Sequence, residues 1–279
     1  MLPIRDLLDG RSIPCVPGHH LSDPLATFSA STPDDFSGGE IMKDTDVVRA
    51  AEFIGAELPR EAWPHWNQGW PRESEAALLD AIFSSRAAYG TPKTGVRAVV
   101  DRWRTHRSVA AGEHLDSLSA LAAFTDRGDE LATILGNRQR VPGNYFTKAE
   151  GAARAAKALA DAGCRCGADV EDTEGLRSAV VSVPGLGPRT FETLVFLSGK
   201  LTATSIDLLA RFATEASSSE ELLSSTDAAE LLVAVAEHLD VDVPTLTHAA
   251  WRYQRTAEQP RRSKKSTTPP AADPLAETA

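Results

Sequence analysis

A short segment with two glycines offers the clearest chemistry in this sequence. Residues 181–196 read VSVPGLGPRTFETLVF, so Gly185 and Gly187 stand one residue apart between two apolar helical patterns. Pro188 suits the first turn of a helix, where its missing N–H costs nothing. The free N–H groups of such a turn favour a bound anion. The segment therefore predicts either an anion-binding turn or a purely structural corner between two helices.

Two helices must hold this turn in place. The pattern TEGLRSAVVS predicts a helix capped by Thr173 or Asp172, and PRTFETLVFL predicts the helix that follows. Glycine in the turn permits a positive φ angle and the close approach of another backbone. Leu186, between the glycines, is expected to tuck beneath the turn and tie the two helices together.

The rest of the chain predicts an all-α fold. Between residues 47 and 256, apolar residues recur at helical spacing in ten or eleven short segments, and no alternating run of strand length is present. Residues 1–46 are expected to be mostly irregular, and 257–279 form a basic, proline-rich tail predicted to be disordered. A helical pattern begins directly after Met42, which makes Met42 a second candidate start besides Met1.

The charge is unevenly distributed along the chain. The formal net charge is -10, and residues 1–46 alone hold eight acidic and three basic residues. Residues 215–242 hold eight acidic residues and no Lys or Arg, whereas residues 86–107 hold six Lys or Arg and one acid. This polarity permits a basic face on an acidic body, which a nucleic-acid-binding protein needs despite its net charge.

Other features favour a monomeric protein of the reducing cytoplasm, associated with the nucleoid if the cell is prokaryotic. Three cysteines cannot form a disulfide framework, and neither a signal peptide nor an apolar run of membrane-spanning length is visible. The histidines and cysteines lack metal-ligand spacing, so we expect no metal site. Trp63, Trp66 and Trp70 form a cluster that either rims a binding site or packs where two subdomains meet.

The glycine turn and its surroundings resemble a known enzyme superfamily. The order apolar-x-Gly-apolar-Gly before a helix resembles the helix-hairpin-helix motif, and Asp207 stands 18 residues beyond Arg189. This spacing is similar to that of the helix-hairpin-helix–Gly/Pro–Asp (HhH-GPD) DNA glycosylases of the endonuclease III-like type. The stretches LLDAIFSSRAAYG, NYFTKAEGAARAAKAL and LTHAAWRYQR resemble further segments of that superfamily, in the same order, over residues 47–256.

This resemblance implies a fold and a reaction. It implies a helical barrel over residues 74–201, a second subdomain from 47–73 and 202–256, and a cleft between them. Double-stranded DNA would be bent so that a damaged or mismatched base flips into the cleft. Asp207, expected at the start of its helix, would stabilise the oxocarbenium-like sugar or activate water. The DNA backbone would be bound by the hairpin, at Val183, Gly185, Leu186, Gly187, Arg189 and Thr190.

The resemblance also implies what the protein lacks. Bifunctional members carry a lysine nucleophile where this chain has Arg189, and a guanidinium supplies no free amine, so a monofunctional enzyme without lyase activity is expected. No cysteine follows Arg255, so the superfamily's iron–sulfur cluster is absent and no cofactor is expected. Arg86 and Tyr89 stand in the turn from which members insert a wedge residue into the DNA; the alternative is an exposed Arg and a half-buried Tyr.

Three positions depart from the superfamily's pattern. Leu208 and Leu209 follow the aspartate, and Phe191 follows the hairpin threonine, where a small residue is usual. These departures favour an alternative in which the protein binds DNA through the hairpin without catalysis, with Asp207 as a cap or first-turn acid. A third possibility is an all-α interaction protein with no role on nucleic acids.

Overall fold

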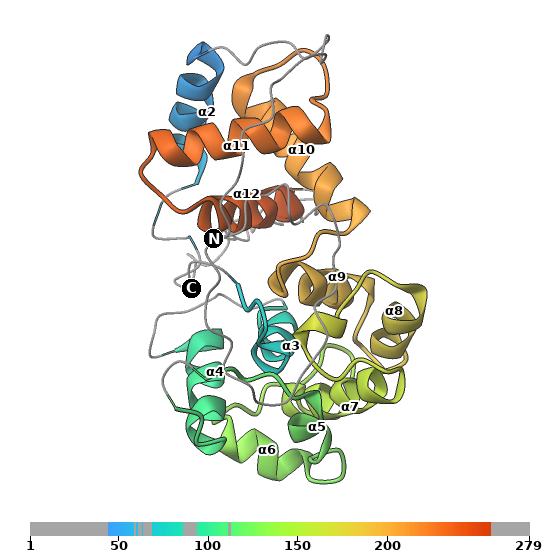
Figure 1. The fold of residues 1–279 in the computed structure, drawn as a ribbon. Helices are drawn as coiled ribbons and strands as arrows, with labels where there is room; N and C mark the ends of the chain where they lie inside the picture. The colour runs from blue at the N-terminus through green and yellow to red at the C-terminus, as the bar shows by residue number, and fades with distance from the viewer. Residues whose placement is uncertain are drawn as a thin grey trace, which may run out of the picture.

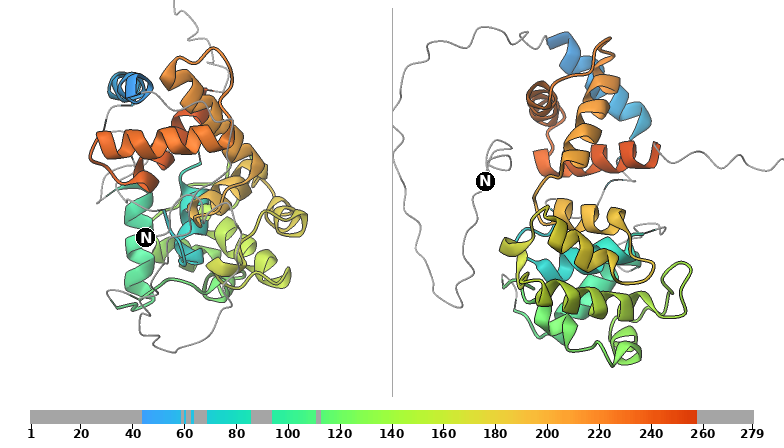
Figure 2. Two further views of the ribbon diagram at one scale, coloured as in Figure 1. Left: turned by 45° about the horizontal axis from the view of Figure 1, so that its top comes forward. Right: turned by 90° about the vertical axis from the view of Figure 1, so that its right-hand side faces the viewer.

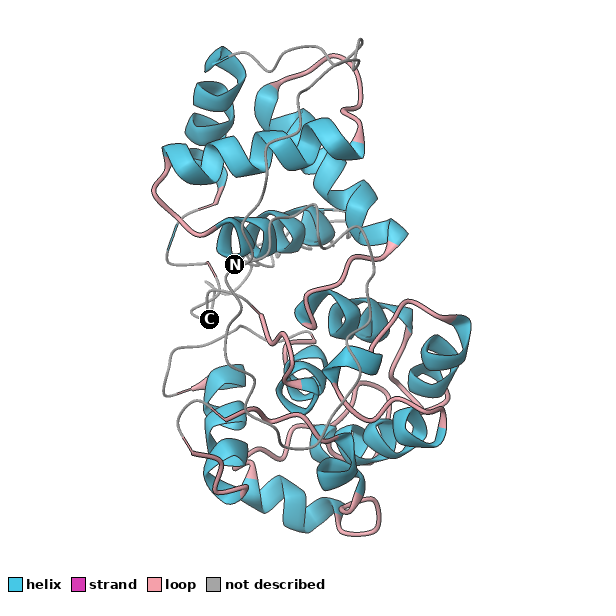
Figure 3. Cartoon of the chain, viewed as in Figure 1, coloured by secondary structure: helices cyan, strands magenta, loops and turns pink. Residues whose placement is uncertain are grey.

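The computed structural model describes residues 44–58, 60, 63, 69–85, 94–110 and 113–257. Within these ranges the chain forms eleven α-helices and one 3-10 turn, and no strand is present, which confirms the predicted all-α fold (Figures 1 and 3). The helices are α2 (Asp44–Glu57), α3 (Ser74–Phe83), α4 (Gly95–His106), α5 (Leu118–Ala122), α6 (Gly128–Ile134), α7 (Lys148–Asp161), α8 (Glu174–Val181), α9 (Pro188–Leu197), α10 (Ala203–Ser217), α11 (Ser225–His238) and α12 (Val243–Ala257); the 3-10 turn η2 is Gly167–Asp169.

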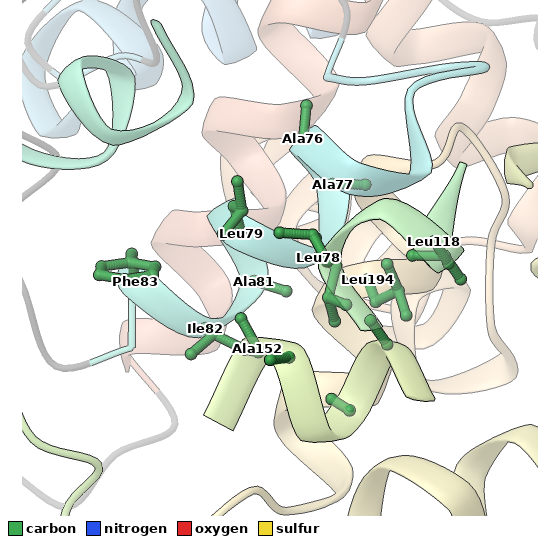
Figure 4. Packing of buried hydrophobic residues seen from close by; sticks show 14 of the residues in the cluster. Ala76, Ala77, Leu78, Leu79, Ala81, Ile82, Phe83, Leu118, Ala152 and Leu194 are labelled. Carbon is green, nitrogen blue, oxygen red and sulfur yellow. The ribbon is translucent and has the colours of Figure 1, made fainter. Parts of the chain in front are cut away.

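Helix α3 lies at the centre of the first hydrophobic cluster. All its residues are buried, the acids Glu75 and Asp80 included, because it packs against α4, α5, α7 and α9. Figure 4 shows Leu78 and Ile82 of α3 facing Ala152 of α7, with Leu118 and Leu194 alongside. The many alanines of α7 allow this close packing of helices. The cluster takes its buried residues from positions 76–197.

A second hydrophobic cluster joins α2, α10, α11 and α12. Its buried residues come from positions 50–63 and 196–251, so segments far apart in sequence meet in one core. The views in Figures 1 and 2 agree that α2, α10, α11 and α12 form one end of the molecule and that α3 to α9 form the other. The chain passes between the two clusters after α9, through Gly199, whose φ is 82°.

Helix α2 begins at Asp44, so the last three residues of the stretch 1–46, which was expected to be mostly irregular, are helical. The rest of that stretch, Met42 and the tail from residue 258 lie outside the described residues. No helix in the described part of the chain is both long and apolar enough to span a membrane.

Candidate functional site

The glycine turn connects α8 and α9 in a tight hairpin. The side chain of Thr173 caps α8 by accepting from the Leu176 N–H at 3.4 Å, and Pro188 occupies the first turn of α9, both as predicted. The Leu186 N–H donates to the Val183 carbonyl at 3.0 Å. Leu186 is 6% exposed and Val183 5%, and both belong to the first cluster, so the leucine does tuck beneath the turn.

The two glycines of the hairpin have different roles. Gly185 has a φ of 81°, and a Cβ there would stand 2.2 Å from Asn144 Nδ2 and 2.6 Å from Val141 Cγ1. Gly187 has an ordinary φ of -121°, caps α9, and would place a Cβ in open space. Only Gly185 therefore needs both the left-handed conformation and the absent side chain.

The hairpin leaves several backbone donors open. Among the described residues no acceptor is present for the N–H groups of Gly185, Gly187 and Arg189, while the Thr190 N–H donates to the Gly187 carbonyl at 2.9 Å. The Arg189 side chain is exposed and has no acidic partner in the described part of the chain. An anion would be attracted by all three features of this turn: the open N–H groups, the guanidinium and the positive end of α9. The Thr190 side chain is 8% exposed, so it contributes packing more than contact with a ligand.

Arg255 of α12 fixes the hairpin helix to the second cluster. Its guanidinium donates to Thr193 Oγ1 and, at 3.1 Å, to the Arg189 carbonyl in the first turn of α9. It also lies over the ring of Trp251, which stacks on Phe196 with centroids 4.2 Å apart. The start of α9 therefore contacts both parts of the molecule: Leu186 packs in the first cluster, and Arg255 reaches it from α12. In the sequence, only a basic residue late in an amphipathic helix hinted at this contact.

Asp207 lies in the second turn of α10, which corrects the expectation that it begins the helix. The side chain of Thr202 accepts from the Ser205 N–H at 3.0 Å and caps the helix, so Asp207 is its fifth residue. Leu208 and Leu209 are buried in the second cluster, which turns Asp207 outward. Its Oδ2 lies 2.8 Å from Nη2 of Arg211, with the two side chains 46% and 49% exposed.

Several arginines of the basic stretch before residue 107 are bonded within the fold. Arg104 pairs with Glu73 and donates to the Glu113 carbonyl at 3.1 Å, and Arg102 donates to the Leu135 carbonyl at 3.1 Å. These side chains fasten α4 to its neighbours. An acid of the chain matches the charge of Arg104, whereas Arg102 is exposed and bonds a carbonyl oxygen.

Arg107 also forms an ion pair within the fold, in this case with a buried acid. Its guanidinium lies 2.8 Å from Oε2 of Glu75, whose side chain is fully buried. Glu75 also accepts from Trp103 Nε1 at 2.6 Å and from the Ser117 N–H at 2.9 Å. Burial raises the pKa of the Glu75 carboxyl, although Arg107 and these two donors act in the opposite direction.

The wedge candidates Arg86 and Tyr89 lie outside the described residues, as does Trp66. Trp63 is 8% exposed, packs in the second cluster and donates to the Leu58 carbonyl at 2.8 Å. Trp70 packs against the first cluster and donates to Asp80 Oδ2 at 2.8 Å. The two described tryptophans thus agree with the packing interpretation of the cluster.

Three further features of the described residues were not predicted from the sequence. Lys148 is 4% exposed and donates to the carbonyls of Phe83 at 3.1 Å and Ser85 at 2.9 Å, and burial lowers the pKa of its amine. Tyr145 is 94% exposed in the loop whose residues contact Gly185. His248 of α12 is buried, which lowers the pKa of its imidazole to about 3.

A separate hollow of about 700 Å³ lies where α11 meets α12. Its lining contains Arg60, Trp63 and the acids Glu237, Asp240 and Asp242, and none of the predicted site residues. In the described ranges, no group of three or more His, Cys, Asp or Glu side chains is placed to hold a metal ion.

In its described part the chain is all-α, and a tight turn with open backbone N–H groups joins α8 to α9. The chain belongs to the family described as "Domain of unknown function (DUF8548)", whose model matches residues 51–255. That range contains both the hairpin and Asp207. No curated protein matches the chain, and no solved structure does.

Proposed function

We propose that this protein is a DNA glycosylase that binds duplex DNA through the α8–α9 hairpin and hydrolyses the N-glycosidic bond of a damaged or mismatched base. It would act as a monomer on DNA in the cytoplasm, or on the nucleoid of a prokaryote. The observation that carries the proposal is the hairpin itself, with three open N–H groups and an exposed arginine ahead of Asp207 on the next helix.

The hairpin fits a DNA phosphate better than it fits a purely structural corner. A corner needs the buried Leu186 and the positive φ of Gly185, and both are present. A corner does not need Gly187, where a side chain would meet open space. The absence of a side chain at this cap leaves the N–H groups of α9 accessible to a phosphate oxygen.

Asp207 supplies the chemistry in this proposal. The bond between the base and C1′ breaks and the base leaves with the electron pair; water adds to C1′, and the proton that it loses ends on the departing base. A carboxylate suits this step because positive charge develops on the sugar, and because it can accept the proton from water. Asp207 faces outward from α10, where a flipped nucleotide can reach it.

Arg189 makes the proposed enzyme monofunctional. A lyase reaction requires an uncharged amine to attack C1′, and a guanidinium remains protonated. The exposed Arg189 instead adds a cation beside the open N–H groups. Trapping of a covalent protein–DNA adduct with borohydride would contradict this part of the proposal.

A second candidate is a DNA-binding protein without catalysis. The Asp207–Arg211 pair favours it, because a carboxylate already matched by a guanidinium is a weaker partner for a sugar cation. The location of Asp207 in the second turn of α10 also departs from the superfamily's arrangement.

Base release from a panel of lesion-containing duplexes separates the two candidates. Each duplex is incubated with the protein and then heated in alkali, which cleaves the strand wherever a base has been lost. The glycosylase proposal expects cleavage with at least one lesion and its loss in Asp207→Asn. Cleavage with none of the lesions, or equal cleavage by Asp207→Asn, would leave the binding protein as the better account.

A further inference from the structure

Arg72 has a backbone conformation that glycine would adopt more easily. It belongs to the turn Trp70–Pro71–Arg72–Glu73, in which the Glu73 N–H donates to the Trp70 carbonyl at 3.0 Å, and its φ is 61°. A proline followed by a residue of positive φ is the pattern of a type II turn, whose third position usually holds glycine. A side chain in the left-handed region is disfavoured there. The chain therefore keeps this arginine against a local conformational preference.

The contacts of Arg72 within the described part of the fold do not explain why it is an arginine. The side chain is exposed, and no acid or carbonyl oxygen in the described ranges accepts from its guanidinium. The other described non-glycine residues with positive φ are Ser108, Ser218 and Asp240, at or just after the ends of α4, α10 and α11. Left-handed residues commonly end helices. Arg72 precedes a helix, so this explanation does not apply to it.

The turn that carries Arg72 is fixed where the chain passes between the two hydrophobic clusters. Pro71 lies beside Gly199, since a Cβ at Gly199 would stand 3.7 Å from the Pro71 Cβ. On the other side, a Cβ at Gly167 of η2 would stand 3.1 Å from the Arg72 Cα. The backbone of Arg72 is therefore held between the end of α9 and η2, and only its side chain reaches solvent.

Lys200 supplies a second cation beside η2. Its ammonium donates to the Ala168 carbonyl at 2.8 Å, and Ala168 follows the glycine against which Arg72 packs. An ammonium has three donors, so one carbonyl leaves two of them for another acceptor. No acid forms an ion pair with Lys200 in the part of the chain that the structure describes. Two cations from distant parts of the sequence thus meet at one turn.

The two acids at η2 are engaged by backbone donors. Asp116 accepts from two N–H groups at 2.6 and 3.1 Å, and Asp169 accepts from two others at 2.8 and 3.1 Å. These bonds fix the loops around η2. Neither carboxylate pairs with Arg72 or Lys200, so both cations remain available to an external anion.

We propose that Arg72 and Lys200 form a second phosphate-binding site for DNA, at the end of α9 opposite the hairpin. The inference rests on the proposed function, since it takes the anion to be a phosphodiester of the bound duplex. Helix α9 has 10 residues, or about 15 Å at 1.5 Å per residue, which a DNA strand spans in about four nucleotides. One duplex can therefore contact both ends of α9. A guanidinium on a fixed turn suits paired, charge-assisted bonds to phosphate.

The salt dependence of affinity for an undamaged duplex tests this site, with urea denaturation alongside. Arg72→Gly removes the cation and relieves the left-handed conformation. It should reduce the slope of log affinity against log salt by about 0.9, while the urea midpoint stays the same or rises. Lys200→Gln should reduce the slope by a similar amount, and Arg72→Lys should retain it.

Ser108→Gly is the matched control for Arg72→Gly. Ser108 is exposed and has a φ of 52°, so glycine relieves a similar conformation without removing a charge. Its slope should equal that of the wild type. Equal slopes in Arg72→Gly and Ser108→Gly would overturn the second site.

The outcomes separate this inference from the proposed function. If the slope falls in Arg189→Gln but not in Arg72→Gly, the second site is wrong and the hairpin remains the DNA contact. If it falls in Arg72→Gly but no lesion is released, the second site is supported and the glycosylase is not. Inorganic pyrophosphate that stabilises the wild type but not Arg72→Gly, with no change in the DNA slope, would assign the cations to a free anion and overturn the DNA site. No binding of the duplex by the wild type would contradict both proposals.

Discussion

The hairpin and helix α4 are both marked by cations in the sequence, and the fold uses them in opposite ways. On α4, Arg104 and Arg107 pair with acids of the chain, and Arg102 caps the end of α6. On the hairpin, Arg189 is exposed beside three backbone N–H groups that have no acceptor in the described ranges. The difference teaches that a count of charges along a sequence locates a binding surface poorly. What matters is whether the fold has already matched each charge.

The largest expected effect is on stability at α4. Glu75→Ala removes a fully buried carboxylate that accepts from Trp103 and Ser117 and pairs with Arg107. We expect a loss of about 3 kcal/mol in the free energy of unfolding, because three donors lose their acceptor. Urea denaturation measures it. Glu113→Ala, at an exposed acid nearby, should change stability by less than about 1 kcal/mol. A loss in Glu75→Ala as small as that expected for Glu113→Ala would show that the buried charges at α4 do not stabilise the fold.

The two hairpin glycines should differ in the same measurement. Gly185→Ala forces a side chain into the left-handed region and into contact with Val141 and Asn144, so a loss of about 2 kcal/mol is expected. Gly187→Ala meets open space and should cost less than about 1 kcal/mol. Equal losses would mean that both glycines serve packing. The hairpin, like α4, would then serve mainly the stability of the fold.

The smallest effect on stability and the clearest effect on binding are expected at Arg189. Arg189→Gln should leave the free energy of unfolding unchanged within about 0.5 kcal/mol, because the side chain is exposed. If it contacts a phosphate, the slope of log affinity for duplex DNA against log salt should fall by about 0.9. Arg107→Gln should do the reverse, with lower stability and an unchanged slope. If Arg189→Gln lowered stability and Arg107→Gln reduced the slope, Arg189 would be the structural arginine and Arg107 the DNA contact, contrary to our assignment.

The sequence was sufficient to predict the helices and the hairpin, since both depend on local patterns. Helical spacing gave the all-α class, and Pro188, Leu186 and Thr173 behave as capping and packing rules require. It was insufficient for the pairing of charges, because that depends on which helices meet. Glu75 lies more than thirty residues before Arg107 in the chain, and Arg255 reaches α9 from the last helix.

The position of Asp207 shows a different limit. The 18 residues between Arg189 and Asp207 can be counted in the sequence. The start of α10, however, is set by Thr202, whose side chain caps the helix. An offset counted along the chain therefore placed the acid one turn too early. The pair with Arg211 follows from the position of Asp207 inside the helix, because side chains four residues apart lie on the same face.

Binding of duplex DNA by two aspartate variants tests the central claim most directly. Gly187→Asp places a carboxylate at the open cap of α9, whereas Gly175→Asp places one at an equally open position in the first turn of α8. With the same added charge, Gly187→Asp should weaken binding about tenfold or more at low salt, and Gly175→Asp should have little effect. Equal affinities of the two variants, with both folded, would contradict a phosphate-binding hairpin and with it the proposed function.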